Sequence, residues 1–149
     1  MVQMKRLVWT GLLLLSTASA INVPLEGWTS LTPTVWVSEG SSCLLRETQH
    51  TKPFEPLATR EDADAFGRKL KSALEQQKMK DVSTESTSRL NQWAVMAVYT
   101  MNSQGKGYYV TQVYLSEGGK LRTITGSARI TSDDTCAFKM REFLRYGAY

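Results

Sequence analysis

Three side chains of this sequence are best suited to nucleophilic, metal-binding or cross-linking chemistry: Cys43, Cys136 and the single histidine, His50. A structural zinc site needs about four ligands at short local spacings, and the chain has no Cys-x-x-Cys pair. A catalytic thiolate needs a neighbouring base, and only His50 could supply an imidazole. In an oxidising compartment, two cysteines favour a disulfide. We therefore predict a Cys43–Cys136 disulfide, with two free thiols as the alternative.

Hydrolytic chemistry has little support in the sequence. A serine–histidine–acid triad would have to use His50, which precedes a proline-containing loop, and no Gly-x-Ser-x-Gly elbow is present. Paired carboxylates for glycosidic cleavage would come from Glu47, Glu55, Glu61, Asp62 or Asp64. Helix capping explains Glu61 and Asp62 equally well. We expect no enzyme, metal or cofactor; the alternative is a cell-wall or lipid hydrolase with His50, Glu47 or Glu55 facing a deep pocket.

Side chains suited to gripping a protein partner gather in the C-terminal half. Tyr108, Gln112 and Tyr114 alternate onto one face of a predicted strand. The next strand carries Thr123, Thr125 and Ser127 at the same spacing. Tyrosine supplies contact area at little entropic cost and is enriched at interfaces. We predict that these tyrosines and Gln112 bind a partner; the alternative is that the tyrosines complete the edge of the core.

A second candidate for partner contact is Phe54, which lies between Pro53 and Pro56 in the segment 50–58. The two prolines would make this segment a rigid finger. The alternative is a simple connection between elements. The sequence leaves open whether this loop or the tyrosine-bearing face is the binding surface.

The N-terminal residues have the order of a secretory signal peptide. Lys5 and Arg6 precede a short apolar run over residues 7–15, and Ala18-Ser19-Ala20 fits a signal-peptidase site. A spanning helix would need about 20 mostly apolar residues. We expect residues 1–20 to be removed and residues 21–149 to form a single exported domain with no membrane span. The alternative is that residues 1–20 form an ordinary N-terminal helix.

The net charge argues against nucleic acid as a partner. The chain has 18 basic and 14 acidic side chains, a balance of +4. Removing residues 1–20, which hold two basic groups, leaves 16 basic and 14 acidic groups, or +2. The densest basic segment, residues 68–80, is interrupted by Glu75 and glutamines, as on a solvated helix face. Nucleic-acid binding needs a denser basic stripe.

Hydrophobic periodicity divides the expected domain into strands and two helices. The predicted strands are residues 34–37, 42–49, 90–101, 107–116 and 120–130. A helix is expected over residues 60–80, after a connection at 50–62 that contains two prolines. The polar segment 81–89 is predicted to be a loop. These elements make an α+β domain: an antiparallel sheet, of N-terminal strands and a C-terminal three-strand meander, with two helices packed on one face and part of the sheet open.

The second helix is expected after Ser132, with Asp133 and Asp134 in its first turn. Its apolar face carries Cys136, Met140, Phe143 and Leu144 at helical spacing. A disulfide from Cys136 would therefore hold this helix against the sheet.

The stretch GYYVTQVYLSEGGKLRTITGSARI, residues 107–130, followed by an amphipathic helix, resembles the PsbP-like fold. This family includes small exported bacterial proteins, and the resemblance extends as a layout over residues 25–146. It implies a non-enzymatic accessory or partner-binding domain, and it assigns no catalytic residues.

These observations predict a small exported protein of the periplasm that acts by binding another protein. A specific form of this prediction is an immunity protein or inhibitor that neutralises a secreted toxin or a cell-wall enzyme. The first alternative is an accessory subunit of an envelope or secretion complex. The second is the hydrolase described above.

Overall fold

A computed structural model describes residue 23 and residues 25–130 and 135–146 of the chain. The predicted signal peptide, and the cap formed by Ser132, Asp133 and Asp134, lie outside the described residues.

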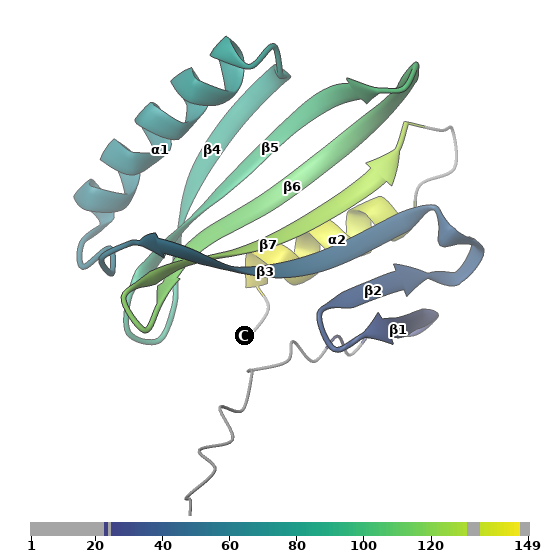
Figure 1. The fold of residues 1–149 in the computed structure, drawn as a ribbon, viewed down its shortest axis with the longest axis horizontal. Helices are drawn as coiled ribbons and strands as arrows, with labels where there is room; N and C mark the ends of the chain where they lie inside the picture. Colours follow the sequence, from purple (N-terminus) through teal and green to yellow (C-terminus); the bar gives the residue numbers. More distant parts are fainter. Residues whose placement is uncertain (1–22, 24, 131–134, 147–149) are drawn as a thin grey trace, which may run out of the picture.

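The structure is a seven-stranded antiparallel sheet with two helices, which agrees with the predicted α+β class (Figure 1). In chain order the elements are β1 (Trp28–Thr32), β2 (Val35–Ser38), a 3-10 turn (Glu39–Ser41), β3 (Cys43–Pro53), α1 (Arg60–Gln76), β4 (Lys80–Ser88), β5 (Trp93–Ser103), β6 (Lys106–Glu117), β7 (Lys120–Arg129) and α2 (Thr135–Tyr146). The strand order across the sheet is β1-β2-β3-β7-β6-β5-β4. The predicted meander is β5, β6 and β7, and it lies in the middle of the sheet.

Two strands were not expected from the sequence. Residues 81–89 were predicted to be a loop, and this prediction is wrong, because Lys80–Ser88 form β4 and pair with β5. Because β4 is an edge strand, most of its side chains are polar and remain at least partly exposed. Only a few, such as Val82 and Thr87, are buried. The short strand β1 forms the other edge. Similarly, β3 continues through His50 to Pro53, into the segment predicted to be a connection.

The helices pack on opposite faces of the sheet, which corrects the expectation that both lie on one face. Gly67 of α1 is next to Val95 of β5. The neighbouring residue Met96 belongs to the apolar cluster that contains Met140 of α2. Since successive side chains of a strand point to opposite faces, α1 and α2 cover different sides. In Figure 1, α1 lies beside β4, and α2 passes behind β3 and β7.

Each helix has its own apolar cluster, and the central strands contribute to both. The α2 cluster includes Met96 and Val113, whereas Ala97 and Val110 belong to the α1 cluster. The close approach of α2 depends on Gly126, because an added Cβ there would lie 2.5 Å from the sulfur of Met140. β5 and β6 therefore connect the two halves of the core.

The predicted disulfide is present in the structure. Cys43 at the start of β3 and Cys136 in the first turn of α2 are bonded, with their Cα atoms 6.1 Å apart. Cys43 is 1% exposed, and Cys136 lies on the same side of α2 as the buried Met140 and Leu144. The bond thus holds α2 against the sheet, as expected from the helical spacing.

Candidate functional site

One half of a sheet face is left uncovered by the described elements. α1 packs on β4 and β5, and α2 packs on the other side of β3, β6 and β7. The side of β3 and β7 that faces away from α2 therefore has no helix over it within the described residues, while on β6 α1 reaches Tyr114 and Val110 (Figure 1). We call this surface the open face. Its side chains are Leu44, Arg46, Thr48 and His50 of β3, Thr123, Thr125 and Ser127 of β7, and Gln112 and Tyr114 of β6.

Gln112 is the centre of a hydrogen-bond network on the open face. The hydroxyls of Tyr114 and Tyr99 both donate to its Oε1, at 2.5 and 3.4 Å. Its Nε2 donates to Oγ1 of Thr125 at 2.9 Å. These three hydrogen bonds hold the side-chain amide of Gln112 between Tyr99, Tyr114 and Thr125.

The two tyrosine hydroxyls stay protonated because they are removed from water. Burial raises the pKa of Tyr99 above the ordinary tyrosine value of 10.0. Burial also raises the pKa of Tyr114, and a negative charge on the nearby Tyr99 would raise it further. Both hydroxyls are consequently hydrogen-bond donors at neutral pH.

The register of the sheet aligns Gln112 with a cation. Gln112 is paired with Thr125, and Thr125 with Arg46 on the next strand. The three side chains form a row across β6, β7 and β3, with directly opposite Cβ atoms about 4.5–5.5 Å apart. In the neighbouring row, Thr123 is paired with Thr48, and its buried hydroxyl shares a hydrogen bond of 2.9 Å with His50, two residues further along β3. The open face therefore carries several side chains that are held by hydrogen bonds. Arg46, at the β3 end of the row, is exposed.

The structure brings Tyr114 and Phe54 to the same aromatic cluster. The rings of Phe54 and Phe66 are 5.1 Å apart, and those of Phe66 and Tyr114 are 5.9 Å apart. The carbonyl of Phe54 accepts a 2.6 Å bond from the hydroxyl of Ser116. Phe54 is half-buried by these contacts and does not project from the surface as a finger. It instead packs against Phe66 of α1, at the border between α1 and the open face.

Tyr108 lies on the same side of β6 as Gln112 but outside its network. It is half-buried, pairs with Met101 and Arg129, and packs against the α1 cluster. Of the four residues predicted to bind a partner, Gln112 and Tyr114 thus share one hydrogen-bond network, Phe54 joins it through an aromatic contact, and Tyr108 stands apart.

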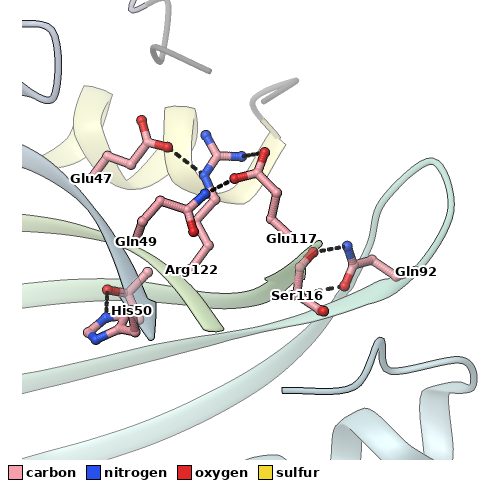
Figure 2. A network of polar contacts seen from close by, with 8 residues as sticks. Glu47, Gln49, His50, Gln92, Ser116, Glu117 and Arg122 are labelled. Carbon is pink, nitrogen blue, oxygen red and sulfur yellow. Dashed lines mark hydrogen bonds and ion pairs between the residues drawn. The ribbon is translucent and has the colours of Figure 1, made fainter. Parts of the chain in front are cut away.

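A buried ion pair occupies the α2 side of the sheet (Figure 2). Nε of Arg122 donates to Oε1 of Glu47 at 2.6 Å, and the two side chains are only 4% and 2% exposed. Glu117 lies 3.6 Å from Nη1 of Arg122 and also accepts from Gln49. From the sequence, Glu47 was expected only as a candidate catalytic acid, and Arg122 was not identified as its partner. The signal was present, because both charges interrupt otherwise apolar alternation, as in Leu45–Glu47 and Arg122–Ile124.

Of the residues named for a hydrolase, His50, Glu47 and Glu55 lie apart from one another. Glu47 is enclosed and paired with Arg122, while His50 points to the opposite face of β3. In Figure 2, His50 lies apart from the Glu47–Arg122 pair. Glu55 is exposed and lines an open hollow of about 420 Å³ with Asp62 and Lys69, beside α1. Two of the candidate carboxylates, Glu55 and Asp62, thus share a hollow, and neither His50 nor Glu47 lines it.

Metal binding and membrane spanning find no support among the described residues. They contain no group of three or more histidine, cysteine or acidic side chains placed to hold a metal ion. Neither described helix has the length and apolarity of a membrane-crossing segment. Comparison with protein-family models and with curated proteins gives no significant match for this chain.

Proposed function

We propose that this chain is a small exported protein that acts by binding a protein partner on its open face. Export is supported by the signal-peptide pattern of residues 1–20 and by the disulfide, which is typical of oxidising compartments. In its specific form, the partner is a secreted toxin or cell-wall enzyme that the protein neutralises. The layout resemblance to PsbP-like proteins supports the same non-enzymatic class.

The observation that carries this proposal is the row of Gln112, Thr125 and Arg46 on an uncovered, rigid sheet. Binding is costly when side chains must first be ordered. Here Gln112 and Thr125 are already fixed by hydrogen bonds, and the backbone beneath them is paired on both sides. A preorganised face with tyrosine and arginine has the composition of many protein interfaces.

The proposal is tested by placing a photo-crosslinking residue at Ser127 of the open face and, as a matched control, at exposed Ser72 of α1. Each variant is produced in its native host and irradiated in the cell envelope. We expect one discrete protein adduct at Ser127 and none at Ser72. Absence of an adduct at Ser127, or the same adducts at both positions, would contradict the proposal.

The identity of the adduct separates the two forms of the proposal. For an inhibitor or immunity protein, purified partner should lose its activity when one equivalent of this protein is added. For an accessory subunit, the adduct should be a component of an envelope or secretion complex whose assembly depends on this protein.

A further inference from the structure

The charged side chains of the open face have one sign. Alternation along β3 and β6 turns Glu47 and Glu117 to the α2 side, where both contact Arg122. β2 and β7 contain no acidic residue. Arg46 remains on the open face, is exposed, and forms no ion pair with the described residues. The sheet thus separates its charges, leaving an unneutralised cation on the uncovered side.

Thr125 is arranged to donate a hydrogen bond outward beside this cation. Its oxygen already accepts from Nε2 of Gln112. The Gln112 oxygen in turn accepts from two tyrosine hydroxyls. A hydroxyl has one hydrogen to donate, and no acceptor for that of Thr125 lies among the described residues. Because Arg46 is directly opposite Thr125 in the strand register, the two side chains start from neighbouring positions on the open face.

We infer that Arg46 and Thr125 form a recognition site for a carboxylate side chain on an acidic loop of the protein partner. The guanidinium offers two parallel donors that match a carboxylate, and the Thr125 hydroxyl supplies a third donor. Gln112, held by Tyr99 and Tyr114, positions Thr125 and does not touch the carboxylate. This inference rests on the proposed function, since it names the chemistry of the partner that the open face binds.

The first experiment uses a blocked hexaglutamate peptide as the probe and blocked hexaglutamine as its neutral counterpart. Each is titrated into ¹⁵N-labelled protein while the Arg46 side-chain N–H and the Thr125 amide are followed by NMR. We expect saturable shifts with hexaglutamate only. Equal shifts with hexaglutamine, or shifts elsewhere with none at Arg46, would overturn the inference.

Substitutions then separate the two donors. Arg46→Gln should weaken hexaglutamate binding roughly tenfold or more, because a charge-assisted hydrogen bond is lost. Thr125→Val keeps the shape of the side chain and should weaken binding roughly threefold, as expected for one neutral donor. Arg68→Gln is the matched control, since Arg68 is an exposed arginine on α1, and it should leave binding unchanged.

The same variants distinguish failure of the inference from failure of the proposed function. If a partner crosslinks at Ser127 and Arg46→Gln weakens its binding roughly tenfold, the inference holds. If that partner binds Arg46→Gln as tightly as wild type, the carboxylate site is wrong while partner binding stands. If no partner is found but hexaglutamate binds through Arg46, the site stands and the proposed function is wrong.

Discussion

Glu47 and Arg122 carry opposite charges into a part of the molecule where water is excluded. Removing two ions from water costs several kcal/mol each, and good geometry recovers this cost only when the remaining polar atoms are also bonded. Here Glu117 and Gln49 add contacts around Arg122, but Oε2 of Glu47 has no hydrogen-bond partner among the described residues. The pair is therefore sensitive to the loss of one member while adding little net stability itself.

We predict that Glu47→Gln lowers the free energy of unfolding by about 3–5 kcal/mol, because Arg122 would be left as a buried charge without its closest partner. The double substitution Glu47→Leu with Arg122→Met should cost less than either change alone. Urea unfolding of the variants measures both effects. Glu55→Gln, at an exposed loop position, is the control, and a Glu47→Gln cost as small as this control would refute the argument.

The buried tyrosines make stability depend on alkaline pH. The pKa values of Tyr99 and Tyr114 are raised in the folded protein, so above pH 10.0 the unfolded chain loses these protons while the folded chain keeps them. The contribution of both groups is fully present below pH 10.0 and is lost as the pH rises towards their folded pKa values.

We therefore predict a steep fall in the free energy of unfolding above pH 10.0, and a shallower fall in the Tyr114→Phe variant. Unfolding curves collected across this range test it, with tyrosinate absorbance reporting ionisation. Tyr146→Phe serves as a control because this side chain is 73% exposed. An unchanged slope in Tyr114→Phe would be inconsistent with a protonated, buried hydroxyl at Gln112.

Among the elements, those with strong apolar periodicity were predictable from the sequence, and the polar edge strands were not. β5 has apolar groups on both sides, and this pattern correctly placed it in the interior of the sheet. β4 is made largely of serine, threonine and charged residues, and only its pairing with β5 makes it a strand. The pairing is local, since residues 89–92 join the two strands, but the polar side chains of β4 lack the apolar alternation by which a strand is recognised in sequence.

α2 was predicted with its correct buried side, and the disulfide explains how this short helix stays in place. It has 12 residues, of which Met140 and Leu144 are fully buried. Isolated helices of this length are marginal in water, so packing on Gly126 and the covalent link to β3 must hold it.

We predict that reduction of the disulfide lowers the free energy of unfolding by about 4 kcal/mol, since the bond joins residues 93 apart in sequence. Guanidinium unfolding with and without a dithiol measures the change. Amide exchange should increase most in α2. Ser42→Ala, which keeps the disulfide but removes the neighbouring hydroxyl, is the control; equal stability of the reduced and oxidised protein would show that the bond is dispensable.

For the molecule as a whole, the sequence was enough to predict which side chains of β6 and β7 share one face of the sheet. It was not enough to predict that Arg46 belongs to the same face. Alternation along residues 107–130 correctly grouped Gln112 and Tyr114 with Thr123 and Thr125. Arg46 could not be added from sequence, because it is 79 residues from Thr125 and the two meet only through the pairing of β3 with β7. The same non-local pairing brought Arg122 to Glu47.

A sheet with helices on both faces could unfold in two steps, one for each apolar cluster. We predict a single step, because β5 and β6 supply alternate side chains to both clusters, and neither cluster can lose these strands alone. Two single-tryptophan proteins test this: Trp36 packs on the α2 cluster, and Trp93 begins β5 on the α1 side. Their denaturation midpoints should coincide.

Gly126→Ala makes this test more stringent. The added methyl group would press on Met140 beneath α2 and should cost about 1–3 kcal/mol as overpacking. If the core is one cooperative unit, the substitution lowers the midpoint reported by Trp93, on the far side of the sheet, as much as that reported by Trp36. Ser127→Ala, on the next residue but turned to the open face, controls for changes in β7 itself. A shift seen only by Trp36 would mean that α2 and its cluster unfold independently, and that the central strands do not couple the two faces.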